Sequence, residues 1–164
     1  MATLTVWKFE TWNAANEAIG TLDGLAKQGV ITVHDAASVT WQPDARRPKT
    51  RQLHHLAKRG ALGGMFWGML FGMIFLIPFI GAAVGAASGA VAGSLRDAGI
   101  DDDFIKAARD QITPGTSALF LLSSDAVLDK VKATFEATGL SKPQLIQSNL
   151  SDEQEAVLRE MFAG

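Results

Sequence analysis

A stretch without charged side chains, residues 60–95, constrains the fold of this chain more than any other feature of the sequence. Its 36 residues would form a single helix about 54 Å long, whereas the hydrocarbon core of a bilayer is about 30 Å thick. Pro78 lies inside the stretch and would interrupt such a helix, because proline has no backbone N–H. We therefore predict a helical hairpin with its turn at Pro78 and with arms at 60–77 and 79–95, each about 26 Å long.

Glycine recurs at every fourth position of both arms. The eight positions are Gly60, Gly64, Gly68, Gly72, Gly81, Gly85, Gly89 and Gly93. Glycine costs about 1 kcal/mol relative to alanine in a helix interior, so another interaction has to offset the loss. A row of glycines lets a second helix backbone approach closely, and we interpret the two rows as packing ridges that drive self-association. A flexible linker is the alternative, but linkers are polar and this stretch is rich in large apolar side chains.

The expected turn, residues 75–80, contains no polar side chain with which to face water. Irregular backbone at membrane depth is tolerated only where protein or a cavity satisfies its hydrogen bonds. Three arrangements therefore stay open: the hairpin crosses the bilayer, re-enters it, or buries its tip in an assembly of identical chains.

A basic segment precedes the apolar stretch. Between residues 45 and 59 there is no acid and there are six basic side chains, which are Arg46, Arg47, Lys49, Arg51, Lys58 and Arg59. Basic flanks favour the cytoplasmic side, and each such residue contributes about 1 kcal/mol near an anionic surface. We predict that these six residues contact the headgroups of anionic membrane lipids. The first ten residues lack the features of a signal peptide, so we expect both termini in the cytosol. A solvated basic loop is the alternative.

The rest of the chain predicts one small α+β domain. Strands are expected at 3–9, 31–41, 116–122 and 142–148, and helices at 11–27, 102–111, 124–139 and 151–162. Thr11 and Ser124 are the expected helix N-caps, and Ser151 with Gln154 forms a capping box. The second strand alternates apolar with polar residues, which is typical of a strand with one buried face.

Without the hairpin, this order of elements suits a ferredoxin-like sandwich, in which helices cover one face of a mainly antiparallel sheet of about four strands. Residues 1–42 and 97–164 would form this domain, 43–59 a basic linker that becomes helical near Arg51, and 60–95 an inserted hairpin. We expect the domain to fold without residues 60–95.

Candidate sites for chemistry are few. The chain has no cysteine and three histidines, His34 and the adjacent pair His54 and His55. Neighbouring side chains on a helix diverge by about 100°, so the pair does not suit one metal ion, although it could sense pH near about 6.5. Asp101, Asp102 and Asp103 are expected to cap a helix rather than to bind calcium.

Catalytic motifs are absent from the sequence, and we predict neither an enzyme nor a small-molecule substrate, a cofactor or a metal site. The net charge is −2 and acidic residues outnumber basic ones after Arg96, so we predict no nucleic-acid partner.

Four features resemble a bacterial family of predicted membrane proteins, domain of unknown function 1269. They are Gly-Ile-Asp-Asp-Asp-Phe-Ile at 99–105, Thr-Pro-Gly-Thr-Ser-Ala-Leu-Phe at 113–120, Leu-Ser at 150–151 followed by Glu-Gln-Glu at 153–155, and the doubled glycine ridge. The resemblance implies a protein of the bacterial inner membrane. It supplies no catalytic residues.

Three functional hypotheses follow. The first is a non-enzymatic membrane-associated protein that forms a homo-oligomer through the glycine-ridged hairpin and carries a cytosolic α+β domain. The second is a self-assembling particle or filament whose hairpins pack against each other instead of spanning lipid. The third is a pore or transport component, which would have to rely on Ser88 and Ser94 because no charged side chain lies in either arm.

Overall fold

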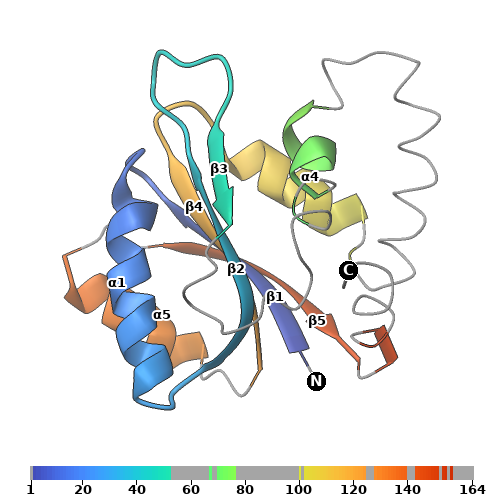
Figure 1. Ribbon diagram of the computed structural model, residues 1–164. Helices are drawn as coiled ribbons and strands as arrows, with labels where there is room; N and C mark the ends of the chain where they lie inside the picture. Colours follow the sequence, from blue (N-terminus) through green and yellow to red (C-terminus); the bar gives the residue numbers. More distant parts are fainter. Residues whose placement is uncertain are drawn as a thin grey trace.

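The computed structural model describes residues 2–52, 67, 70–76, 100, 102–124, 128–139, 143–151, 153, 154 and 156. The elements in chain order are β1 (Ala2–Phe9), α1 (Ala14–Lys27), β2 (Thr32–Thr40), β3 (Lys49–Gln52), the π-helix η2 (Gly72–Leu76), α4 (Asp102–Gln111), β4 (Ser117–Ser124), α5 (Leu128–Ala137) and β5 (Gln144–Leu150) (Figure 1).

The strands form one five-stranded sheet in the order β3-β2-β4-β1-β5. All four neighbouring pairs are antiparallel, and β4 lies at the centre between β2 and β1. The predicted α+β class with an antiparallel sheet is therefore confirmed.

Helices cover both faces of this sheet, so the molecule has three layers (Figure 1). On one face α1 and α5 pack over a cluster that includes Trp7, Leu119 and Phe135. On the other face η2 and α4 pack over a second cluster that includes Val6 and Phe120. Because side chains alternate along a strand, β1 and β4 contribute to both clusters.

Several predicted element boundaries are confirmed. The helix expected at 102–111 is α4, with the same bounds. Gly29 and Gly139 follow α1 and α5 with φ values of 77° and 85°, the left-handed conformation that glycine adopts readily just after a helix. The Ser151 Oγ accepts a hydrogen bond from the Gln154 backbone N–H, and the Gln154 Oε1 accepts one from the Ser151 N–H, so the capping box is present.

One predicted N-cap is wrong. The α1 helix begins at Ala14 with Asn13 as its N-cap, and Thr11 instead accepts a hydrogen bond from the Ser117 Oγ through its carbonyl oxygen. The N-cap of α1 therefore lies two residues later than local propensity predicts. Ser124 is the last residue of β4, and α5 is described from Leu128 onward. Residues 125–127 lie outside the described residues, so the N-cap predicted at Ser124 stays a prediction.

The prediction of one buried face for β2 is also wrong. Residues 35–39 are all buried, because Ala36 packs under α1 and α5 while Ala37 and Val39 pack under η2 and α4. A register shift between Val33 and Asp35 interrupts its pairing with β4.

Strand β3 lies inside the segment that we interpreted as a linker. Its residues pair with β2, from Ala37 opposite Gln52 to Thr40 opposite Lys49. Arg51 is therefore in an edge strand and not at the start of a helix. Charged side chains are common on edge strands because they discourage pairing with another chain.

Candidate functional site: an apolar segment docked on the sheet

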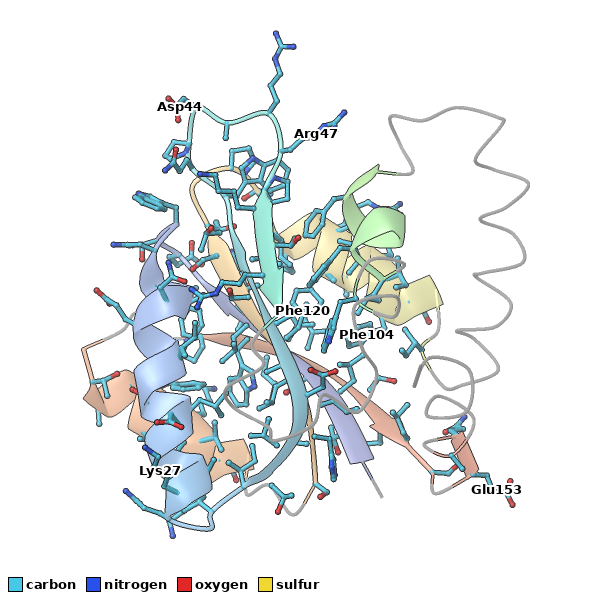
Figure 2. All side chains as sticks on the ribbon, in the orientation of Figure 1. Lys27, Asp44, Arg47, Phe104, Phe120 and Glu153 are labelled. Atoms are coloured by element: carbon cyan, nitrogen blue, oxygen red, sulfur yellow. The ribbon has the colours of Figure 1, made fainter. Side chains whose placement is uncertain are left out.

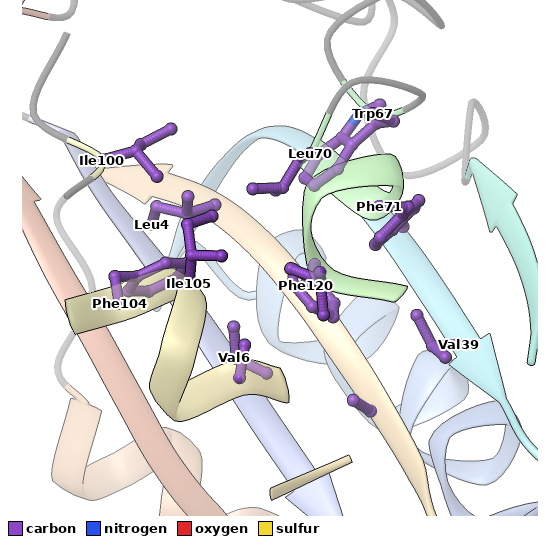
Figure 3. Packing of buried hydrophobic residues seen from close by; sticks show 14 of the residues in the cluster. Leu4, Val6, Val39, Trp67, Leu70, Phe71, Ile100, Phe104, Ile105 and Phe120 are labelled. Carbon is purple, nitrogen blue, oxygen red and sulfur yellow. The ribbon is translucent and has the colours of Figure 1, made fainter. Parts of the chain in front are cut away.

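Part of the predicted hairpin packs against the α+β domain. Trp67, Leu70, Phe71, Ile74 and Phe75 are each at most 8% exposed and belong to the cluster beneath α4. Their spacing of three and four residues forms a helical stripe. Figure 3 shows the first three of them beside Phe120 of β4. This segment is thus a core element of the described structure.

Aromatic rings make most of this contact. The Phe71 and Phe120 ring centroids are 5.0 Å apart at an interplanar angle of 89°, and those of Trp67 and Phe120 are 6.4 Å apart at 85°. Trp41, just after β2, contacts Phe75 at 5.9 Å. Edge-to-face pairs of this kind contribute about 0.5–1.5 kcal/mol each beyond the area they bury.

Arg109 joins the docked segment to α4. Its Nε donates a hydrogen bond of 3.1 Å to the carbonyl oxygen of Ile74 within η2. The last carbonyls of a helix have no partner in the helix itself, and a cation near them is favourable. Arg109 therefore helps to fix the end of η2 against the domain.

One ridge glycine, Gly72, lies in the described structure. It is half-buried, and among the described residues no atom would lie within 4 Å of a Cβ atom built there. The described residues therefore leave room for a side chain at this position of η2. The other ridge glycines and Pro78 lie outside the described residues, so the predicted hairpin turn and its packing stay predictions.

The predicted headgroup contacts separate into two groups. Arg46 and Arg47 are exposed in the connection between β2 and β3, and Lys49 and Arg51 are exposed on β3. Figure 2 shows Arg47 extending from the tip of this connection. No ion pair joins these four to another residue in the described part of the chain. The remaining two, Lys58 and Arg59, fall outside it.

The remaining polar positions that the structure describes include His34 and the buried Asp35. The His34 Nε2 lies 2.9 Å from the Ser124 Oγ, and the buried Asp35 accepts a hydrogen bond from the Ala36 N–H. Among the described residues no group of three His, Cys, Asp or Glu side chains could hold a metal ion. His54 and His55 are not described.

A cavity of about 360 Å³ lies between α1 and α5, on the opposite side of the sheet from η2. Its lining includes Gly20 and Gly24 of α1 and Lys130 and Thr134 of α5. Lys130 and Thr134 are surface residues of α5, and none of the other described residues around the cavity indicates a ligand.

Within the described ranges, no helix combines the length and the apolar character needed to span a bilayer. Residues 60–66 and 77–95 are outside those ranges.

Sequence reasoning missed the docking of Trp67, Phe71 and Phe75. A signal was present, because large apolar residues recur at helical spacing on one side of the first arm. It was obscured because the whole stretch is apolar, and a core helix then looks like a membrane helix.

A family model described as "Protein of unknown function (DUF1269)" matches residues 61–163, which is more than half of the chain. No curated protein and no solved structure matched the chain.

Proposed function

Because the chain belongs to the DUF1269 family, whose function is unassigned, we propose that it is a non-enzymatic, membrane-associated protein of the bacterial inner membrane that self-associates through its glycine-ridged stretch. The α+β domain lies in the cytosol. The strand order supports a ferredoxin-like domain, to which β3 adds an edge strand.

One observation carries the proposal: the 36-residue stretch without charge contains a segment that is docked on the domain and continues for 19 uncharged residues, 77–95, beyond it. The docked stripe uses one side of that helix, and no described atom would lie within 4 Å of a Cβ atom built at Gly72, which supports a close approach of a second backbone there. The apolar residues that follow, 77–95, then need a lipid or protein environment of their own.

Docking limits how deeply this stretch enters a bilayer. Phe75 and Ile100 belong to the same cluster, so the 23 residues from Ile77 to Gly99 start and end at one domain. Two complete crossings require about 40 residues at about 20 each. With the stripe docked, we propose a re-entrant segment rather than two full crossings.

A self-assembling particle or filament is the second candidate. The docked stripe favours it, because residues that bind a protein core in one part of the stretch can bind protein in another. In this case the ridges of several chains would pack together without lipid.

Cell fractionation tests the proposal. We expect the full-length protein in the membrane pellet after a carbonate wash, with release only by detergent and a size above that of a monomer. A protein that is soluble and monodisperse without detergent or lipid contradicts membrane association. A large soluble assembly favours the second candidate.

A further inference from the structure

The two edge strands of the sheet, β3 and β5, differ in the features that discourage pairing with a strand of another chain. The β3 edge is four residues long and exposes Lys49 and Arg51. The β5 edge is seven residues long and contains no charged residue and no proline. Its register with β1 runs from Ala2 opposite Leu150 to Lys8 opposite Gln144 without a shift. Short length, charge, proline and bulges are four of the common protections of an edge, and β5 has none of these four.

Each of the two hydrophobic clusters also has a partly buried apolar side chain of β5 at its margin. Leu145 packs against the cluster under α1 and α5, and Ile146 packs against the cluster under η2 and α4. An added strand would cover both side chains at once, because neighbouring residues of a strand point to opposite faces. In the described part of the chain, β1 is the only strand that pairs with β5.

We propose that β5 pairs antiparallel with β5 of a second copy of this chain, so that two sheets join into one across a twofold axis perpendicular to them. Such an axis keeps each face on its own side, and the Leu145 face of one copy continues into that of the other. Identical uncharged strands do not repel each other, whereas two β3 edges would bring four cations together. This interface is separate from the glycine ridge.

Hydrogen–deuterium exchange of the full-length protein tests the pairing without any variant. In an edge strand, alternate backbone N–H groups point away from the sheet and exchange quickly. We expect protection of these β5 amides to rise with protein concentration. Protection that is absent, or that does not change with concentration, overturns the proposal, because pairing with a second copy follows mass action.

A charged edge gives the second test. Gln144 and Asn149 are exposed, and Gln144→Lys with Asn149→Lys places cations along the β5 edge. The dissociation constant of the dimer should rise about tenfold or more, with loss of the concentration-dependent protection. Thr50→Lys adds one cation at an exposed position of the opposite edge, on β3, and should change neither. Equal association in the double variant and the wild type contradicts the interface. Carbonate extraction should be unchanged in all three, which separates this result from membrane binding.

Discussion

At the scale of single residues, the contact between Phe71 and Phe120 decides whether the apolar segment belongs to the core. Phe71→Ala and Phe120→Ala should each lower the free energy of unfolding by roughly 3–5 kcal/mol, because each leaves a cavity. The loss of unfolding free energy in the double variant should be smaller than the sum of the two single losses by about 0.5–1.5 kcal/mol. Each single variant already removes the Phe71–Phe120 ring contact, so the sum includes that contact twice. Denaturant unfolding measures all three.

Phe135→Ala supplies the control for this cycle, because Phe135 lies in the cluster on the opposite face. Its effect should add to that of Phe71→Ala within about 0.5 kcal/mol. Strict additivity of Phe71→Ala and Phe120→Ala would show that the two rings do not meet in solution.

Gly72 separates folding from assembly. Gly72→Ala meets no atom in the described structure and should raise the free energy of unfolding by up to about 1 kcal/mol. Gly72→Leu should instead hold a neighbouring backbone away and lower the stability of the oligomer. Mass photometry in detergent reads the size. Gly20→Leu, an open position on α1, should leave assembly unchanged, and an unchanged oligomer in Gly72→Leu would remove the ridge from the interface.

At the scale of elements, the connection between β2 and β3 presents the basic residues of the described structure to an anionic surface. Arg46→Gln with Arg47→Gln should weaken binding to vesicles that contain anionic lipid by about 2 kcal/mol, or roughly 30-fold, because each residue contributes about 1 kcal/mol. Vesicle co-sedimentation at low and high salt measures the loss. Lys130→Gln with Lys132→Gln on α5 changes the net charge equally, so an equal effect of both pairs would mean that the connection has no special role.

The docked helical segment predicts the outcome of two deletions. Replacing residues 60–95 with a short Gly/Ser bridge removes five buried side chains, each stabilising by roughly 1.5–3 kcal/mol, and this sum approaches the whole stability of a domain. We expect loss of cooperative unfolding, contrary to the expectation from the sequence. Replacing only 78–95 should keep it. Calorimetry compares the two, and a stable domain after the larger deletion contradicts the docked arrangement.

Elements with local signals could be predicted from the sequence, and elements defined by tertiary contacts could not. The acid-rich start of α4 and the glycine after α1 specify their own positions. Strand β3 was missed because Lys49 and Arg51 are solvated, so no apolar alternation marks it. The docked segment was missed because hydropathy does not distinguish a protein core from lipid. Of the predicted site residues, Gly72, Arg46, Arg47, Lys49 and Arg51 are described, and the four basic ones are exposed as the sequence predicted for a solvated or headgroup-facing segment.

At the scale of the whole molecule, the sheet fixes the halves of the chain on the same side of any membrane, because β1 pairs with both β4 and β5. Single cysteines at Asn16 and Thr113, both exposed, should therefore react with an impermeant thiol reagent only after the inner membrane is opened. The natural chain has no cysteine, so no background arises. Labelling in cells whose inner membrane is intact would exclude a cytosolic domain.

The central claim is that the apolar residues beyond the docked segment enter the membrane while the segment itself stays on the sheet. Two single-cysteine variants, Ala83→Cys and Gly72→Cys, carry an environment-sensitive fluorophore for this test, because a Cβ atom at Gly72 meets no described atom and leaves the docked side chains in place. Vesicles with a nitroxide quencher on the lipid acyl chain then report which position reaches hydrocarbon. We predict strong quenching at residue 83 and weak quenching at residue 72. Equal quenching at both positions would show that the segment leaves the sheet, and absence of quenching at residue 83 would contradict membrane insertion.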